Sequence, residues 1–347
     1  MQKRGKDIKV MAHEKIGLLR IIFMFSVLIF ISMANCGCDE ALQSSNNSNK
    51  FDKSLIGQAD RILQDGLNNQ DPRIRTAAIE AVAATKKTEY MNIVSGLLKD
   101  EYVPVRFVAA VAVGDTEYRP AESDLKKLLK APDENSQIAA AYALAKLGHN
   151  RNLDIIRKEV KNEDQTVRAN AVMLLGKVGK KEDLKLLYSV KNDETSDDKV
   201  VFQTVEAIAA LGDERIFDKL WAVVLSTYAD DKILGIRAMG KLGTPKAKDV
   251  LITKLDDDVL EVRLAAAEQL GMLGDMTGEP EVMDVFTKDL TNGLDKAGKE
   301  RVYTLTALAI GQIRTPKLEA FLPELLQNES NFVRLAAAKA VFLCAKN

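Results

Sequence analysis

A pattern with a period of 31 residues recurs along most of this 347-residue chain. Arg168, in the stretch "DQTVRANAVMLLGKVG", serves as the zero position of the pattern. Equivalent positions follow at spacings of 31, 31, 31, 33, 31, 31, 40 and 31: Arg75, Arg106, Gln137, Arg168, Val201, Lys232, Arg263, Tyr303 and Arg334. A fixed period of roughly 20 to 50 residues is typical of solenoids, in which each repeat packs on its neighbours. The chain is therefore expected to form one array of repeats.

Each unit predicts two helices. Apolar residues recur at positions −1, +3, +4, +6 and +7, which is the stripe of an amphipathic helix, and only 5% of all residues are aromatic. The expected N-caps four residues before the zero position are Asp71, Asp133, Asp164 and Asp197. Glycines expected to end this helix in a left-handed conformation are Gly148, Gly179, Gly212, Gly243 and Gly274. Apolar residues near +19 and +23 predict a second helix, so the fold class is an all-α solenoid.

The run "VRxxAxxxLGxxG", complete from Val167 to Gly179 and nearly so from Val262 to Gly274, resembles the HEAT repeat in the short form found in phycobilin lyase-type repeat proteins. The resemblance covers residues 51–347. It implies an α-solenoid, or superhelix, of about nine two-helix units, with the "VR" helix second in each pair and lining the concave face. The motif is specific for the fold and weak for function, because this solenoid serves many unrelated tasks.

The N-terminal segment has the features of an export signal. Six basic residues precede the apolar run "IIFMFSVLIFISMA", Ile21 to Ala34, which at about 1.5 Å per residue is shorter than the roughly 30 Å hydrocarbon core of a membrane. Residues 1–35 are therefore predicted to be a signal peptide or membrane anchor, with a cleaved signal favoured. Residues 36–50 are polar and predict a flexible linker.

Two cysteines at the end of this segment are lipidation candidates. The stretch "SMANCGCDE" resembles the lipobox of bacterial lipoproteins, with Cys36 or Cys38 as the lipidated residue. Asn35 departs from the lipobox pattern for both cysteines, and Ser32-Met33-Ala34 also fits an ordinary cleavage site. The expected location is the bacterial cell envelope, with a membrane-anchored lipoprotein favoured over a freely secreted protein.

The search for chemistry finds no catalytic, cofactor or metal constellation. The formal net charge of −1 gives no electrostatic basis for nucleic-acid binding. The chain has two histidines, and the only His-Glu pair, His13-Glu14, lies in the export segment, unlike the paired motifs of deoxyhypusine hydroxylase, an iron enzyme of this fold. Cys344 is expected to be a buried, inert thiol. The recurring arginines are expected to cover the seams between units, each head meeting an Asp or a carbonyl of a neighbouring turn.

One candidate interaction surface lies at positions +5 and +9 on the concave face. Val111, Tyr142 and Met173 occupy +5 in consecutive units, beside Lys146 and Lys177 at +9. Exposed apolar side chains with basic neighbours suit a groove that binds a protein or peptide. The alternative places Val111 and Met173 half-buried between units. Farther along, Glu206, Arg237 and Glu268 alternate in sign, which predicts an ion-pair ladder between units.

Nine extra residues interrupt the period within Gly274 to Glu300, where insertions in solenoids form either a binding element or a tolerated surface loop. Two functions compete for the whole chain. The first is a non-enzymatic, exported and membrane-tethered scaffold that binds a partner protein or peptide along its concave face. The alternative is a phycobilin lyase-like enzyme or enzyme subunit. Export favours the scaffold, because phycobilin lyases and their substrates are cytoplasmic.

Overall fold

The computed structural model describes residues 53–345, and every regular element within that range is helical. The predicted signal or anchor (1–35), the linker (36–50), Cys36 and Cys38 lie outside the described residues. Each unit contributes one inner helix that carries the zero position. The inner helices are α3 (Pro72–Thr85), α5 (Val103–Asp115), α7 (Glu134–Lys146), α9 (Gln165–Val178), α11 (Asp198–Ala210), α13 (Ala229–Leu242), α15 (Leu260–Met272), α17 (Lys296–Ile313) and α20 (Asn331–Cys344).

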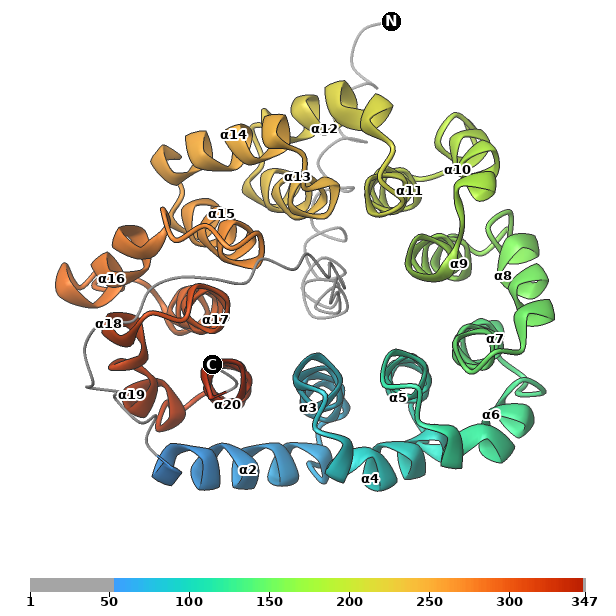
Figure 1. The fold of residues 1–347 in the computed structure, drawn as a ribbon, viewed down its shortest axis with the longest axis horizontal. Coiled ribbons are helices and arrows are strands. Elements are labelled where there is room, and N and C mark those ends of the chain that lie inside the picture. Colours follow the sequence, from blue (N-terminus) through green and yellow to red (C-terminus); the bar gives the residue numbers. More distant parts are fainter. Residues whose placement is uncertain (1–52, 346–347) are drawn as a thin grey trace, which may run out of the picture. The chain divides into compact units, whose positions relative to one another are not determined.

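The outer helices precede the inner helices in the chain and are mostly shorter (Figure 1). They are α2 (Lys53–Leu67), α4 (Met91–Gly96), α6 (Glu122–Leu128), α8 (Leu153–Glu159), α10 (Leu184–Lys191), α12 (Phe217–Val224), α14 (Pro245–Thr253) and α16 (Glu279–Thr287), followed by the pair α18 (Pro316–Glu319) and α19 (Leu322–Leu326). Apolar residues at +19 and +23, such as Leu220 and Val224 in α12, are buried against the inner helices. The predicted all-α solenoid of two-helix units is confirmed.

The helix ends follow the sequence with one exception. The four predicted N-cap aspartates all accept hydrogen bonds from backbone N–H groups of the first helical turn. Four of the five predicted C-terminal glycines have positive φ. The prediction for Gly179 is wrong, since its φ of −67° and ψ of 172° are extended. A Cβ at Gly179 would lie only 2.3 Å from the carbonyl oxygen of Leu175, so glycine is needed there for close approach.

The recurring basic residue links consecutive units. The guanidinium of Arg75 donates to both carboxylate oxygens of Asp100 at 2.9 Å. Arg168 Nη2 lies 2.6 Å from Asp193 Oδ2, and Lys232 Nζ lies 2.9 Å from Asp257 Oδ2. A hydrogen bond that involves a charged group contributes about 1.5–3 kcal/mol when it is shielded from water. The predicted structural role of these residues is confirmed.

The first and last units are neighbours. Helix α20 packs against both α2 and α3, so residues 53–345 close into a ring with the inner helices around its interior (Figure 1). A Cβ at Gly66 in α2 would lie 2.9 Å from both Ala78 Cβ and Leu335 Cδ2, which shows how tightly this seam is packed. Lys87 Nζ also lies 4.0 Å from the ring centroid of Phe342. The two terminal units therefore cover each other's apolar faces.

The insertion lengthens the connection between α16 and α17, and α17 has 18 residues. Part of the connection packs on the solenoid. The hydroxyl of the buried Thr291 lies 3.0 Å from the hydroxyl of Tyr303, which occupies the zero position of this unit. Phe286 stacks on Phe321 with ring centroids 4.1 Å apart. A binding role for the insertion stays a prediction.

Candidate functional site

The predicted concave interaction residues lie within the packing between inner helices. Val111 is 2% exposed and Tyr142 is 1% exposed, while Met173 and Lys146 are half-buried. The prediction that Val111 and Tyr142 are exposed is therefore wrong. The reason for Tyr142 is Gly114 on the neighbouring helix, where a Cβ would lie 2.8 Å from Tyr142 Cε1. The missing side chain leaves the space that the tyrosine ring fills between α5 and α7.

Asp115 joins two of the predicted residues. The Tyr142 hydroxyl donates a short hydrogen bond to one carboxylate oxygen of Asp115, and Lys177 Nζ donates to the other at 2.6 Å. Burial, followed by the Asp115 charge, raises the pKa of Tyr142, while burial lowers the pKa of Lys177 against the opposing effect of Asp115. Lys146 stands apart, with its Nζ 4.0 Å from Glu117 Oε1. This network ties α5, α7 and α9 together.

The predicted ion-pair ladder at +5 has a different pairing. Glu206 accepts a short hydrogen bond from Lys241 at +9 of the next unit, and a second from Gln203 at 2.8 Å. The prediction that Glu206 pairs with Arg237 is therefore wrong. The cation that reaches the Glu206 carboxylate is Lys241 at +9.

Glu80, at +5 in α3, is the most unusual group of the inner face. It is 3% exposed, and neither carboxylate oxygen has a hydrogen-bond partner among the described residues. Burial raises the pKa of Glu80 from 4.5 to about 8, although Lys339, Lys177 and Arg237 act in the opposite direction. These three cations belong to three other units. Burial therefore favours the protonated form of Glu80.

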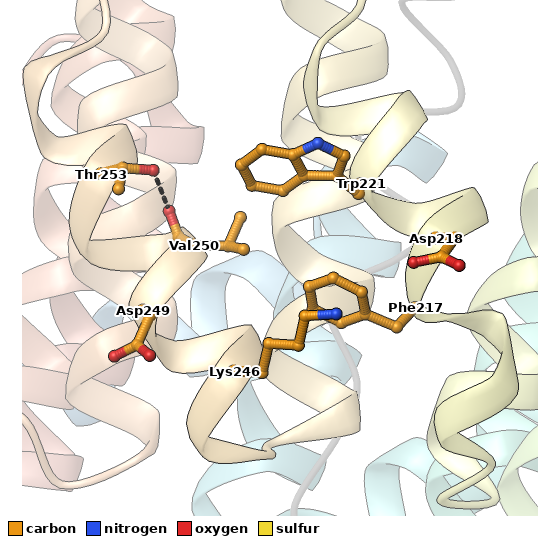
Figure 2. Close-up of a pocket in the computed structure, with 7 residues that line it drawn as sticks. All are labelled: Phe217, Asp218, Trp221, Lys246, Asp249, Val250 and Thr253. Carbon is orange, nitrogen blue, oxygen red and sulfur yellow. Dashed lines mark hydrogen bonds between the residues drawn. The ribbon is translucent and has the colours of Figure 1, made fainter.

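An open groove lies on the outer side of the ring, between α12 and α14 (Figure 2). It has a volume of about 400 Å³ and is lined by Phe217, Asp218, Trp221, Lys246, Asp249, Val250 and Thr253. Figure 2 shows the two aromatic side chains reaching from α12 toward Val250 and Lys246 of α14, with both aspartates at the rim. Trp221 is 38% exposed, and its ring stacks on Phe217 with centroids 6.5 Å apart.

The groove exists because α12 has two apolar stripes. Leu220 and Val224 are buried against the solenoid, whereas Phe217, Trp221 and Leu225 repeat every four residues on the other face. Leu225 is 55% exposed. On the opposite wall, Lys246 Nζ lies 3.8 Å from the centroid of the Phe217 ring, so its charge is held over an aromatic face. A wall of this kind offers apolar contact with few polar groups.

Sequence reasoning missed this groove although a signal was present. The repeat pattern was defined only by the buried +19 and +23 positions of the outer helices. The neighbouring position +20 is Ser95, Lys126 and Arg157 in α4, α6 and α8, but it is large and mainly apolar in the next four outer helices: Tyr188, Trp221, Ile252 and Met283. We call these four residues the outer row.

Within residues 53–345, no group of three or more His, Cys, Asp or Glu side chains is placed to hold a metal ion. Over the same residues, no helix combines the length and the apolar character needed to cross a membrane. His149 is exposed, with Nε2 3.0 Å from Glu122 Oε1. Cys344 is buried as predicted, and burial, followed by the Glu319 charge, raises the pKa of its thiol to about 12.

Comparison with known proteins agrees with the repeat register. Residues 121–209 match the family model described as HEAT repeats. This stretch of the chain is similar to HEAT repeats. A curated relative, phycocyanobilin lyase subunit alpha of Nostoc sp., is 30% identical over 138 residues, which are 39% of this chain and 48% of that protein. The chain thus spans about half the length of this relative.

Solved structures with similar arrangements are more distant. Human deoxyhypusine hydroxylase in complex with glycerol is 16% identical, with a TM-score of 0.38 over 77% of this chain and 99% of that chain. The complex of CpcE and CpcF of phycocyanin lyase from Nostoc sp. is 16% identical, with a TM-score of 0.31 over 89% of this chain and 98% of that chain. At these scores neither structure carries a functional argument.

Proposed function

We propose that this HEAT-repeat protein is a non-enzymatic scaffold that binds a partner protein through the groove between α12 and α14. The observation that carries the proposal is the exposed Trp221 in a groove of about 400 Å³, at a position where α6 and α8 have the charged residues Lys126 and Arg157. Tryptophan is enriched among the residues that dominate binding energy at protein interfaces. The burial of Val111 and Tyr142 supports a docking surface on the outer side of the ring over one on the concave face.

The variant Trp221→Lys tests the groove. Lysine occupies the equivalent position as Lys126 in α6, so the fold is expected to tolerate it. Removing a buried interface tryptophan costs on the order of 2 kcal/mol or more, which is roughly a thirtyfold loss of affinity. The full-length chain would be cross-linked in its native cells and its partners quantified by mass spectrometry.

The matched control is Met276→Lys, which adds the same charge at a residue that is 57% exposed and outside the groove. We expect Trp221→Lys to remove a defined partner that Met276→Lys retains. Equal recovery of every partner by the two variants would exclude docking at the groove.

The proposal includes export and tethering to the bacterial cell envelope. It is supported by the basic and apolar segment before Cys36 and Cys38. We expect a lipid-modified Cys36 or Cys38 at the mature N-terminus and membrane-bound protein. Both should be lost in the double variant Cys36→Ala, Cys38→Ala. Cell fractionation with mass spectrometry of the N-terminal peptide measures this, and an intact N-terminus in the cytoplasmic fraction would contradict it.

A second function is favoured by the 30% identity to phycocyanobilin lyase subunit alpha. Under this alternative the chain is a lyase-like enzyme or an enzyme subunit. Covalent attachment of phycocyanobilin to a phycobiliprotein in the presence of the purified chain would establish that function. An attachment rate equal to that of the uncatalysed reaction would exclude the lyase function and leave the scaffold as the proposed function.

A further inference from the structure

The outer row has a charge pattern that indicates the chemistry of its partner. Its four side chains lie on α10, α12, α14 and α16, which follow one another along the outer side of the ring (Figure 1). Trp221 is 38% exposed and Ile252 is 37% exposed, while Tyr188 and Met283 are half-buried. Of the eight large hydrophobic residues that are exposed in the described chain, four lie between Trp221 and Ile252: Trp221, Leu225, Tyr228 and Ile252.

One border of this apolar surface is acidic. It is formed by the connections that leave α10, α12 and α14 and by the first turns of the inner helices that follow them. Five exposed carboxylates there have no ion pair within the described residues: Glu194, Asp198, Asp230, Asp256 and Asp258. Asp256 follows Ile252 by four residues, so the acidic border begins about one helical turn from the outer row. We call these five residues the acidic border.

Three cations near the acidic border are engaged with other carboxylates. Lys232 and Lys254 both lie within ion-pair distance of Asp257, at 2.9 and 3.6 Å, and Arg168 pairs with Asp193. Their charges offset Asp257 and Asp193 and not the five carboxylates of the acidic border. The opposite border of the row, at the first turns of the outer helices, mixes both signs, as in Lys181 beside Glu182. A positively charged partner is therefore attracted to the side of the outer row that carries the acidic border.

We propose that the outer row docks an amphipathic segment of a partner protein, with an apolar seam on Trp221 and Ile252 and Lys or Arg side chains facing the acidic border. This inference rests on the proposed scaffold function and names the partner chemistry at the same groove. Apolar contact supplies affinity, and complementary charge at the rim sets the orientation and accelerates association. The segment is a helix or an extended chain that places apolar and basic residues on separate sides.

Trp221 provides a direct readout, because it is the only tryptophan in the chain. Two tryptophan-free synthetic peptides would share one leucine seam and differ only in their flanking residues, which are lysine in one and glutamate in the other. We expect the lysine peptide to shift the Trp221 emission and to bind at least about tenfold more tightly than the glutamate peptide. This preference should shrink as salt rises from about 50 to about 500 mM, because salt screens exposed charges.

The variant Asp230→Asn, Asp256→Asn, Asp258→Asn should reduce the preference to about threefold or less while the lysine peptide still shifts the Trp221 emission. The matched control Glu101→Gln, Glu163→Gln, Glu324→Gln removes as many exposed carboxylates elsewhere and should keep the preference. Equal affinity for the two peptides, or binding that leaves the Trp221 emission unchanged, would overturn the inference.

The two proposals fail in different ways. If neither peptide binds but Trp221→Lys still loses its cross-linked partner, the groove docks a partner of different chemistry and only this inference is wrong. If the lysine peptide binds at Trp221 while Trp221→Lys retains every cellular partner, the proposed scaffold function at the groove is wrong. The preference of the groove for an apolar segment with basic flanks is then retained.

Discussion

The variant Leu335→Ala is expected to destabilise the protein by about 2–5 kcal/mol. This is the cost expected for a leucine inside the array, although Leu335 belongs to the last repeat. Leu335 is 3% exposed because its side chain meets Gly66 of the first unit. In an open solenoid the same side chain would face water at the terminal unit, and its truncation would cost little. Urea unfolding, followed by circular dichroism, measures the difference.

Leu264 is the matched control, since it occupies the same repeat position in the seventh unit and is fully buried. Leu264→Ala reports the cost of truncation within the array. A destabilisation by Leu335→Ala below about 0.5 kcal/mol, with the usual cost at Leu264, would show that the ring is open in solution. Hydrogen exchange of the α2 amides provides a second test. Exchange in α2 should accelerate in Leu335→Ala and remain slow in Leu264→Ala.

Features set by neighbouring residues were predictable from the sequence. Asp71, Asp133, Asp164 and Asp197 cap helices because a short side chain reaches the free N–H groups of the next turn. Arg168 crosses to the next unit because the repeat places an acidic turn within its reach. Both relations depend on spacing along the chain, which the 31-residue period displays directly.

Ring closure was not predictable in this way. It depends on small rotations between units that accumulate over nine repeats, and no single residue encodes them. Closure brings Gly66 against Leu335 and places Glu80 within the influence of cations from distant units. The burial of Tyr142 had a cause that is visible in the sequence but ambiguous. Gly114 could be recognised as part of a helix, but the sequence alone does not show that the aromatic side chain of Tyr142 fills the space beside it.

The groove between α12 and α14 was predictable only in part. Phe217, Trp221 and Leu225 form a second apolar stripe that is plain in the sequence. Periodicity alone does not say whether such a stripe packs on a neighbouring helix or faces water. The distance between outer helices decides this, and closure of the ring sets that distance.

Replacement of Glu80 by glutamine is expected to remove most of the pH dependence of stability between pH 4.5 and about 8. Burial raises the pKa of Glu80 above its unfolded value of 4.5, so the folded protein keeps a proton that the unfolded chain releases. The contribution of Glu80 to the free energy of unfolding is therefore highest below pH 4.5, falls as the pH rises and levels off above about 8. A shift from 4.5 to about 8 corresponds to on the order of 5 kcal/mol. Glutamine retains the shape of the protonated side chain and has no proton to lose.

Urea unfolding at pH values of about 5 and about 9 measures this difference. Glu182→Gln, at an exposed site, is the control and should follow the wild type. Lys339→Met adds a test of the cause. Removing a cation that favours ionised Glu80 should raise the pKa of Glu80 further, so the decline in stability should extend to higher pH. Parallel loss of stability in the wild type and Glu80→Gln would instead show that water reaches this carboxylate. In that case the inner face of the ring is a solvated channel, and its charged side chains are available to a ligand.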